Sequence, residues 1–218
     1  MATDEPNASL RATLEPALLA WLVYQGLWGC YYLLCSLVPE PSSTAMNVGY
    51  VVTTCVCAVW ITRHWWRDRA QCRLFVRPRR GVVEMCLLVG IVGAILLAMF
   101  ERNILSWSTT TVMWEREQGW PLLLALVPFA VLPAVFEEML FRGVLLHRFQ
   151  LVLSLPMAIA MQAMLFSVMH LDGAYVLPHF AFGCLAGFLR MAARSLWPCM
   201  LMHFLWNGWI AATIYGLV

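Results

Sequence analysis

The sequence predicts an all-α integral membrane protein with about seven transmembrane helices, within a range of six to eight. The chain has 218 residues, of which 62% are hydrophobic and only 12% are charged, and its mean hydropathy is +0.74. A soluble domain of ordinary composition carries roughly 25% charged residues. Several apolar runs also approach the length of about 20 residues that a helix needs to cross a bilayer. This composition excludes a disordered chain, a coiled coil and a small disulfide-stapled secreted domain.

The apolar runs divide the chain into a polar tail over residues 1–15 and a single transmembrane domain over residues 16–218. We expect front spans within residues 16–100 and a back half over residues 120–218, with a polar segment between them. The expected spans are about 16–38, 45–62, 81–100, 120–136 and beyond, 155–170, 174–191 and 196–218. Residues 144–153 could form one further short helix.

Arginine is concentrated in residues 63–80, which hold seven arginines and one aspartate. Clustered arginine is also the electrostatic footprint of a nucleic-acid site. Short arginine-rich loops beside membrane spans, however, stay in the cytoplasm and set the topology. We therefore expect no nucleic-acid partner, a surrounding lipid bilayer, and a cytoplasmic amino terminus in a bacterial plasma membrane. The sequence does not indicate an oligomeric state.

The small residues of the apolar runs are expected to pack helices rather than to perform chemistry. Of the eight cysteines, only Cys72 lies in a polar segment, and no C-x-x-C pair is present. The spacings of a zinc ribbon or a thioredoxin-like motif are therefore absent. Gly183 and Gly187 form a G-x-x-x-G step, which lets two helices approach closely.

Ionisable side chains inside the expected fourth span are the first functional signal. A charged side chain at the bilayer centre costs about 2.5 to 3.5 kcal/mol on insertion scales. Glu138 and Arg142 are four residues apart, so they share a helix face and can pair. Glu137 points about 100° away from them and is left without that partner.

Two later spans add further polar groups. The fifth expected span ends on His170, and the seventh carries His203 and Asn207 on one helix face. Each group alone is compatible with a structural role, such as a hydrogen bond between helices. Together with an unpaired carboxylate, however, they are the groups that a water-activating site needs, namely a base, a helper and two oxyanion donors.

These residues form three ordered motifs that resemble those of a known family. The motifs are Glu137-Glu138-x-x-x-Arg142, Phe166-x-x-x-His170 and His203-x-x-x-Asn207. They are similar to the motif set of the CPBP family of intramembrane glutamic proteases, which includes the type II CAAX prenyl endopeptidases. The resemblance covers about residues 120–215, and the front half shows only generic hydropathy.

The resemblance implies an intramembrane endopeptidase that acts on a peptide or protein substrate at the membrane, including prenylated CAAX-type substrates. It implies that Glu137 deprotonates the attacking water and that His170 helps to hold this water. It also implies that His203 and Asn207 stabilise the tetrahedral oxyanion, with Glu138 and Arg142 as a supporting pair. No cofactor is expected.

Three other functions remain open from the residues. The weakest is a transporter, because the polar residues lie in one half and no inverted repeat is visible. A glutamate and two histidines could bind Zn²⁺ with three protein ligands, although the chain has no H-E-x-x-H motif and Arg142 would place a fixed cation beside the ion. Alternatively, the same groups could be the buried polar network of a non-catalytic membrane scaffold or of an immunity-type protein.

The expected span boundaries leave one inconsistency in depth. At about 1.5 Å per residue, His203 and Asn207 lie roughly 10 to 20 Å from the cytoplasmic ends of their span. Glu137 reaches a similar depth only if the fourth span extends to Arg148. His170 then lies nearer to the far side, unless the fifth span begins earlier, near Leu151.

Overall fold

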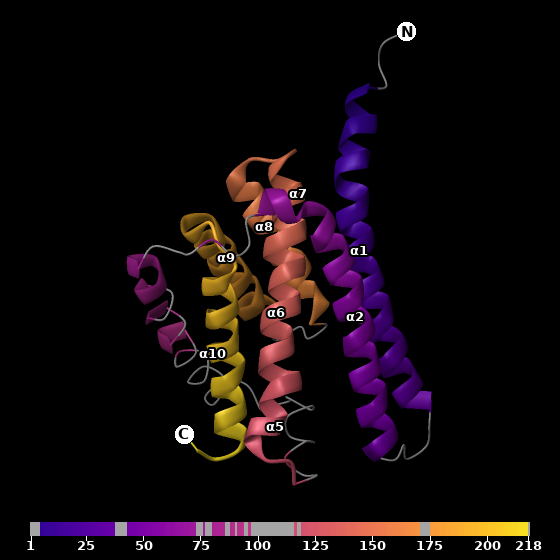
Figure 1. Ribbon diagram of the computed structural model, residues 1–218, viewed down its shortest axis with the longest axis vertical. Coiled ribbons are helices and arrows are strands. Elements are labelled where there is room, and N and C mark those ends of the chain that lie inside the picture. Colours follow the sequence, from indigo (N-terminus) through magenta and orange to yellow (C-terminus); the bar gives the residue numbers. More distant parts are fainter. Residues whose placement is uncertain are drawn as a thin grey trace.

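The computed structural model shows a bundle of helices (Figure 1). It describes residues 5–37, 43–72, 76, 80–85, 88–89, 91–93, 96, 116, 119–170 and 175–217. This part of the chain is helical and holds no strand, as the sequence predicts. Its elements are α1 (Glu5–Leu37), α2 (Ser43–Cys72), α5 (Leu122–Leu126), η1 (Val127–Val131), α6 (Leu132–Glu138), η2 (Met139–Leu145), α7 (Leu146–Gln150), α8 (Leu155–Met169), α9 (Val176–Ala193) and α10 (Trp197–Ile214).

Among the described residues, three helical stretches are long and apolar enough to cross a bilayer. They are Leu10–Leu37, Leu122–Gln150 and Val176–Ala193, while the apolar α8 is shorter. The expected third span over 81–100 and the polar segment that follows it lie largely outside the described residues. A total of about seven spans therefore stays a prediction.

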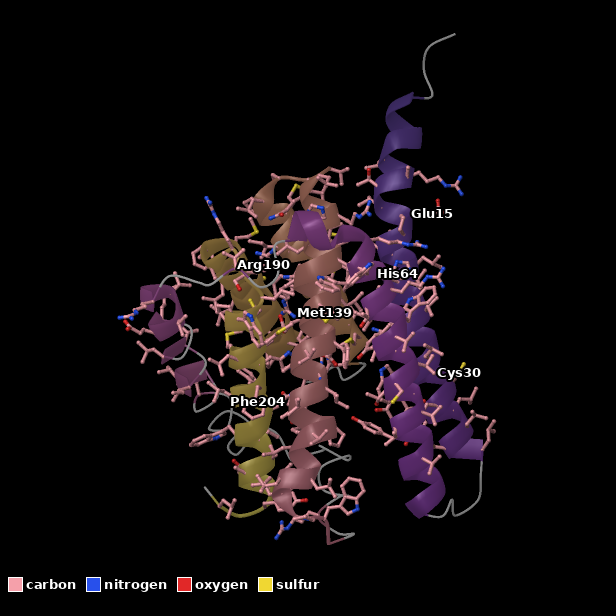
Figure 2. All side chains as sticks on the ribbon, in the orientation of Figure 1. Glu15, Cys30, His64, Met139, Arg190 and Phe204 are labelled. Atoms are coloured by element: carbon pink, nitrogen blue, oxygen red, sulfur yellow. The ribbon has the colours of Figure 1, made fainter. Side chains whose placement is uncertain are left out.

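The first two helices are longer than the expected spans. α1 begins at Glu5, so most of the expected polar tail is helical and continues directly into the first span. Arg11 and Glu15 form an exposed ion pair one turn apart, at 3.0 Å, on this extension (Figure 2). α2 continues ten residues past the expected end at residue 62, to Cys72. Arginine is a good helix former, so the arginine-rich residues that follow the apolar run can continue α2.

The fourth span is one continuous helix from Leu122 to Gln150. The short helix considered over 144–153 is therefore largely the end of this long helix. The segments η1 and η2 have the wider π-helical turn. Such segments inside α-helices are frequent at functional sites. Pro133 lacks the N–H that would bond the carbonyl of Phe129 in an α-helix, so this carbonyl is open to another donor.

The turn over residues 151–154 removes the expected inconsistency in depth. The long helix ends at Gln150 and α8 begins at Leu155, so the two run in opposite directions from this turn. Glu137 lies thirteen residues before Gln150, and His170 lies fifteen residues after Leu155. At about 1.5 Å per residue, both are roughly 20 Å from the turn. They are thus at the same level although α8 does not begin near Leu151.

Helices α8 and α9 pack closely through the G-x-x-x-G step. A Cβ on Gly183 would lie 2.8 Å from the Cα of Ala163, and one on Gly187 would lie 2.9 Å from the Nε2 of Gln162. Gln162 Nε2 also donates to the carbonyl of Gly183 at 2.7 Å. The predicted packing role of the two glycines is confirmed.

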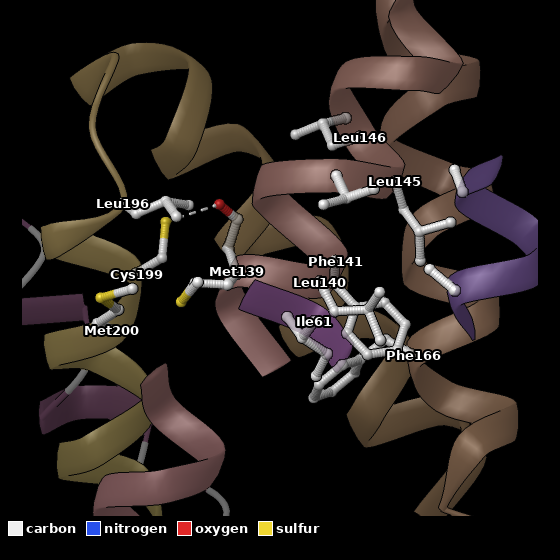
Figure 3. Close-up of a cluster of buried hydrophobic side chains, with 14 of the residues drawn as sticks. Ile61, Met139, Leu140, Phe141, Leu145, Leu146, Phe166, Leu196, Cys199 and Met200 are labelled. Carbon is white, nitrogen blue, oxygen red and sulfur yellow. Dashed lines mark hydrogen bonds between the residues drawn. The ribbon is translucent and has the colours of Figure 1, made fainter. Parts of the chain in front are cut away.

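No disulfide joins the cysteines whose side chains the structure describes, and two of these cysteines serve packing. Cys57 and Cys199 are buried in the hydrophobic core. The Cys199 thiol also donates to the carbonyl of Ala186 at 3.2 Å, which ties α10 to α9 (Figure 3). The side chains of Cys72 and Cys86 lie outside the described part of the chain.

One hydrophobic core joins the front and back halves. The α1–α2 hairpin packs against the η2 segment of the long helix. Ile61 of α2 is fully buried in one cluster with Leu140 and Phe141 of η2 and with Phe166 of α8 (Figure 3). The hairpin is therefore part of the core that surrounds the motif residues.

Replacing Gly183 with alanine should lower the thermal unfolding temperature of the protein. The new Cβ would overlap the backbone of Ala163, so α8 and α9 must separate, at a cost of about 1 to 3 kcal/mol. Unfolding in detergent, followed by circular dichroism, measures the change. Gly26→Ala on α1 is the matched control, since nothing lies within 4 Å of that position. Equal unfolding temperatures for the Gly183→Ala variant and the unmodified chain would contradict the close packing.

Candidate active site

Two adjacent carboxylates lie where α6 passes into η2, near the middle of the bundle. Met139, the first residue of η2, marks this level (Figure 2). Glu138 is fully buried and Glu137 is 9% exposed. A buried charge is costly unless it is paired and hydrogen-bonded. The partners of the two carboxylates therefore decide what each can do.

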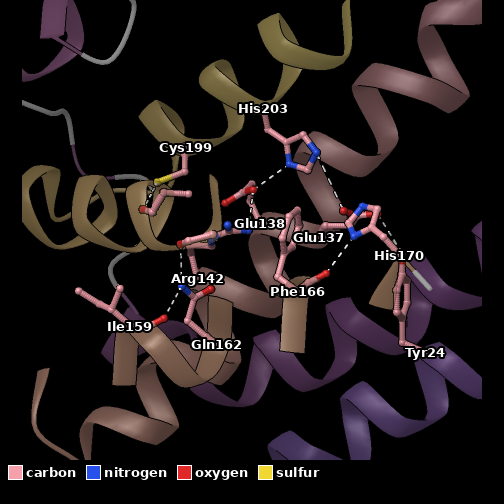
Figure 4. Close-up of polar contacts among 12 residues, drawn as sticks. Tyr24, Glu137, Glu138, Arg142, Ile159, Gln162, Phe166, His170, Cys199 and His203 are labelled. Carbon is pink, nitrogen blue, oxygen red and sulfur yellow. Dashed lines mark hydrogen bonds and ion pairs between the residues drawn. The ribbon is translucent and has the colours of Figure 1, made fainter. Parts of the chain in front are cut away.

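One carboxylate oxygen of Glu138 contacts two partners, a guanidinium and an imidazole. Arg142 Nη1 donates to Glu138 Oε1 at 2.9 Å, as the four-residue spacing predicts. His203 Nδ1 of α10 lies 2.8 Å from the same oxygen (Figure 4). Because Nδ1 is committed to Glu138, the other ring nitrogen, Nε2, is directed towards Glu137.

Aromatic rings surround the Arg142 guanidinium. Its Nε and Nη2 are buried without a hydrogen-bond partner among the described residues. The guanidinium carbon instead lies 4.6 Å from the centroid of Phe166, 5.6 Å from that of Phe182 and 5.9 Å from that of Phe141. A cation near the faces of aromatic rings is stabilised by their quadrupoles. These rings therefore hold the cation beside Glu138 in an apolar interior.

Glu137 has a different and less complete set of partners. Its Oε1 accepts a hydrogen bond from the hydroxyl of Tyr24, on α1, at 3.1 Å (Figure 4). Its Oε2 is buried and has no hydrogen-bond partner in the described part of the chain. His203 Nε2 lies 4.0 Å from this oxygen. This distance is too long for a direct hydrogen bond but is in the range that one water molecule can bridge.

Tyr24 is a contact of the site that the sequence does not predict. It lies in the front half, in an apolar span, and no motif surrounds it. The only available signal is general, since a buried tyrosine hydroxyl usually finds a hydrogen-bond partner. Sequence alone does not say that this partner is a glutamate 113 positions away.

His170 joins the group through the ring of Phe166. Its Nδ1 lies 2.9 Å from the Phe166 carbonyl, one turn earlier. The Phe166 ring lies 4.9 Å from the His170 ring and 6.0 Å from the His203 ring, between centroids. His179 of α9, which is outside the three motifs, stacks on His170 at 3.7 Å. The stack and the carbonyl contact together set the orientation of the His170 ring.

Asn207 lies one turn beyond His203 on α10 and contacts the long helix. Its Nδ2 donates to the carbonyl of Phe129 at 2.9 Å. This is the carbonyl that Pro133 leaves without an α-helical donor. An asparagine amide carries two N–H donors, so this contact uses one of them. The structure thus places Asn207 against η1 and not in direct contact with the carboxylates.

The contacts divide the six predicted site residues into groups. Glu137, Glu138, Arg142 and His203 are linked by direct contacts or by the 4.0 Å separation at Glu137. His170 and Asn207 border this group through Phe166 and through α10. In the described ranges, no group of three or more His, Cys, Asp and Glu residues is arranged to hold a metal ion.

A comparison with protein families identifies the back half. Residues 119–209 match the family model described as Type II CAAX prenyl endopeptidase Rce1-like. The chain carries an Rce1-like domain. This domain includes all three motifs, and it confirms the predicted resemblance to the CPBP family. The comparison with curated proteins found no match, and the comparison with solved structures found none either.

The three long apolar stretches of the described chain indicate an integral membrane protein, and residues 119–209 resemble a protease family. Tyr24 lies outside the matched residues. The cytoplasmic position of the amino terminus and the bacterial source remain predictions.

Replacing Arg142 with methionine should destabilise the protein strongly. The change keeps much of the side-chain volume but leaves the Glu138 carboxylate buried without its cation, which costs about 3 to 5 kcal/mol. Adding Glu138→Gln should recover part of this loss, because the uncompensated charge is removed together with its partner. Thermal unfolding of the two variants measures both effects.

The exposed pair supplies the control for this prediction. Arg11→Met on α1 removes an ion pair of the same spacing at the surface, where such pairs contribute about 0 to 1 kcal/mol. Similar losses for Arg142→Met and Arg11→Met would contradict the role assigned to the buried pair.

Proposed function

We propose that the chain is an intramembrane endopeptidase in which Glu137 activates a water molecule for attack on a peptide bond. The observation that carries this proposal is the second oxygen of Glu137. It is buried and lacks a partner among the described residues, as Oε2 of Glu138 also does, but it lies 4.0 Å from His203 Nε2, so one water can bridge this oxygen and this ring nitrogen. The Rce1-like domain supports peptide hydrolysis as the class of reaction.

The unequal pairing of the two carboxylates suits them to different tasks. The Glu138 oxygen that receives both Arg142 and His203 is occupied, so this carboxylate holds the other groups in place. Among the described residues, the one ion pair of Glu137 is the long contact with His203, at 4.0 Å. Glu137 is therefore the carboxylate that can take up a proton from water and release it again.

In the proposed reaction, Glu137 takes a proton from water while the water oxygen bonds to the carbonyl carbon of the substrate. The carbonyl becomes a tetrahedral oxyanion. The proton then moves from Glu137 to the amide nitrogen, the C–N bond breaks, and a carboxylic acid and an amine leave. His170, which borders the same group, is proposed to hold the water before attack.

Charge balance supports His203 as a donor to the oxyanion. Two carboxylates and one guanidinium leave the buried group with one negative charge, and an imidazolium at His203 would neutralise it. A protonated imidazole donates from both nitrogens. Nδ1 would then donate to Glu138 and Nε2 to the oxyanion. The remaining N–H of Asn207 is proposed as the second donor.

We propose prenylated peptides of the CAAX type as the substrate class. The family description that matches residues 119–209 names a CAAX prenyl endopeptidase. Apolar helices enclose the site, so a substrate whose carboxyl terminus is anchored by a lipid would be delivered at the level of the membrane. The family match is the support for the lipid requirement, and a peptide without its farnesyl group tests this requirement separately.

Replacing Glu137 with glutamine should abolish hydrolysis while leaving the fold intact. Glutamine keeps the shape and can still accept from Tyr24, but it cannot take a proton from water, and loss of a general base costs about 100-fold to 10,000-fold in rate. The full chain is reconstituted in phospholipid vesicles with a farnesylated CAAX peptide, and products are identified by mass spectrometry. Glu84→Gln, at an exposed carboxylate of the front half, should hydrolyse the peptide at the unmodified rate.

Each alternative function has its own outcome in this assay. Full activity of the Glu137→Gln variant would contradict the proposal. Inhibition by 1,10-phenanthroline that Zn²⁺ restores would favour the zinc-dependent protease, whereas activity in the chelator supports the proposed reaction. Equal hydrolysis of the peptide without its farnesyl group would keep the endopeptidase and overturn the substrate class. If the Glu137→Gln variant does not hydrolyse the peptide but keeps its biological effect in cells, the scaffold or immunity-type protein is favoured.

His203→Ala and Asn207→Ala should each lower kcat about 100-fold to 1,000-fold, the usual effect of removing one oxyanion donor. Asn207→Ala should also lower the free energy of unfolding, by about 1 to 3 kcal/mol, because the Phe129 carbonyl loses its donor. Steady-state kinetics and thermal unfolding of both variants test this pair of effects. A rise in KM with unchanged kcat in either variant would assign that residue to substrate binding instead.

A further inference from the structure

We propose that Tyr24 of α1 is a positioning residue of the active site, and that the front half of the chain thereby completes a site whose motifs all lie in the back half. Tyr24 would act by holding Oε1 of Glu137, so that Oε2 is the oxygen presented to the reacting water. This inference rests on the proposed function of Glu137 as the base.

The contact between the two residues is buried and specific. The Tyr24 hydroxyl donates to Glu137 Oε1 at 3.1 Å, with Tyr24 6% exposed and Glu137 9% exposed. Within the described ranges, no other hydrogen bond reaches this carboxylate. A hydrogen bond to an ionised acceptor is about twice as strong as one between neutral groups. Tyr24 is therefore the group that determines the orientation of the Glu137 carboxylate.

The orientation matters because the two oxygens of a carboxylate are otherwise interchangeable. The terminal torsion of a glutamate is broad and nearly two-fold, so an unrestrained carboxylate can rotate. With Oε1 bound to Tyr24, Oε2 is kept 4.0 Å from His203 Nε2. Without the hydroxyl, rotation would move both oxygens away from this arrangement for part of the time. Positioning of this kind affects the chemical step more than substrate binding.

A second tyrosine allows positioning to be separated from simple docking of the hairpin. The Tyr50 hydroxyl of α2 also donates to the long helix at 3.1 Å, but to the backbone carbonyl of Pro128. Apolar burial of Ala20 and Ile61 already docks the hairpin in the common core. Loss of one hydroxyl should therefore leave the hairpin in place in either case.

The test compares Tyr24→Phe with Tyr50→Phe in the vesicle assay with the farnesylated peptide. Tyr24→Phe should lower kcat about 10-fold to 100-fold, the loss expected for one hydrogen bond to a charged group. Its KM should stay close to that of the unmodified chain, whereas its unfolding temperature should fall, because a buried carboxylate oxygen loses its donor. Tyr50→Phe should leave kcat unchanged.

Two results would overturn the inference. Unchanged kcat in Tyr24→Phe would show that the hydroxyl is not needed. Equal losses of kcat in Tyr24→Phe and Tyr50→Phe would assign both tyrosines to docking. The Glu137→Gln variant separates these failures from a failure of the proposed function. If Glu137→Gln is inactive while Tyr24→Phe is fully active, only the positioning role is lost; if Glu137→Gln is fully active, the proposed function itself is lost.

Discussion

The burial of two neighbouring carboxylates in an apolar interior is the constraint on which the rest of the site depends. Adjacent residues of a helix point in different directions, so one cation cannot serve both. Arg142 and His203 meet one oxygen of Glu138 at 2.9 and 2.8 Å, while Glu137 receives only the hydroxyl of Tyr24. Each carboxylate keeps one buried oxygen without a hydrogen-bond partner among the described residues, but the guanidinium pairs with Glu138 and not with Glu137.

The helices around this pair bring its partners to one level. Close packing of α8 and α9 at Gly183 and the turn over 151–154 place Phe166 beside the Arg142 guanidinium. The same ring touches the rings of His170 and His203. The Phe166 ring thus lies beside both imidazoles and beside the Arg142 guanidinium. A loss of packing between α8 and α9 would disturb the site even though neither glycine touches a carboxylate.

Side chains of both halves of the chain meet in one hydrophobic core around the site. The family match covers residues 119–209, but the core extends over α1 and α2, and Tyr24 reaches Glu137 from outside the matched range. The matched residues alone therefore lack the group that donates to Glu137 Oε1. The front hairpin therefore has a proposed role in the chemistry as well as in membrane anchoring.

Composition, hydropathy and spacing determined that this protein is helical and suited to a membrane, that Glu138 pairs with Arg142, and that Gly183 packs closely. These properties follow from one helix at a time, because helical periodicity alone sets which side chains share a face. The tertiary structure decided three other contacts. They are the hydrogen bond of Tyr24 to Glu137, that of Asn207 to the Phe129 carbonyl, and the stack of His170 on His179. Each joins residues of different helices or depends on where a helix begins and ends. No local pattern specifies how two helices rotate and shift against each other, since that is set by the packing of the whole core.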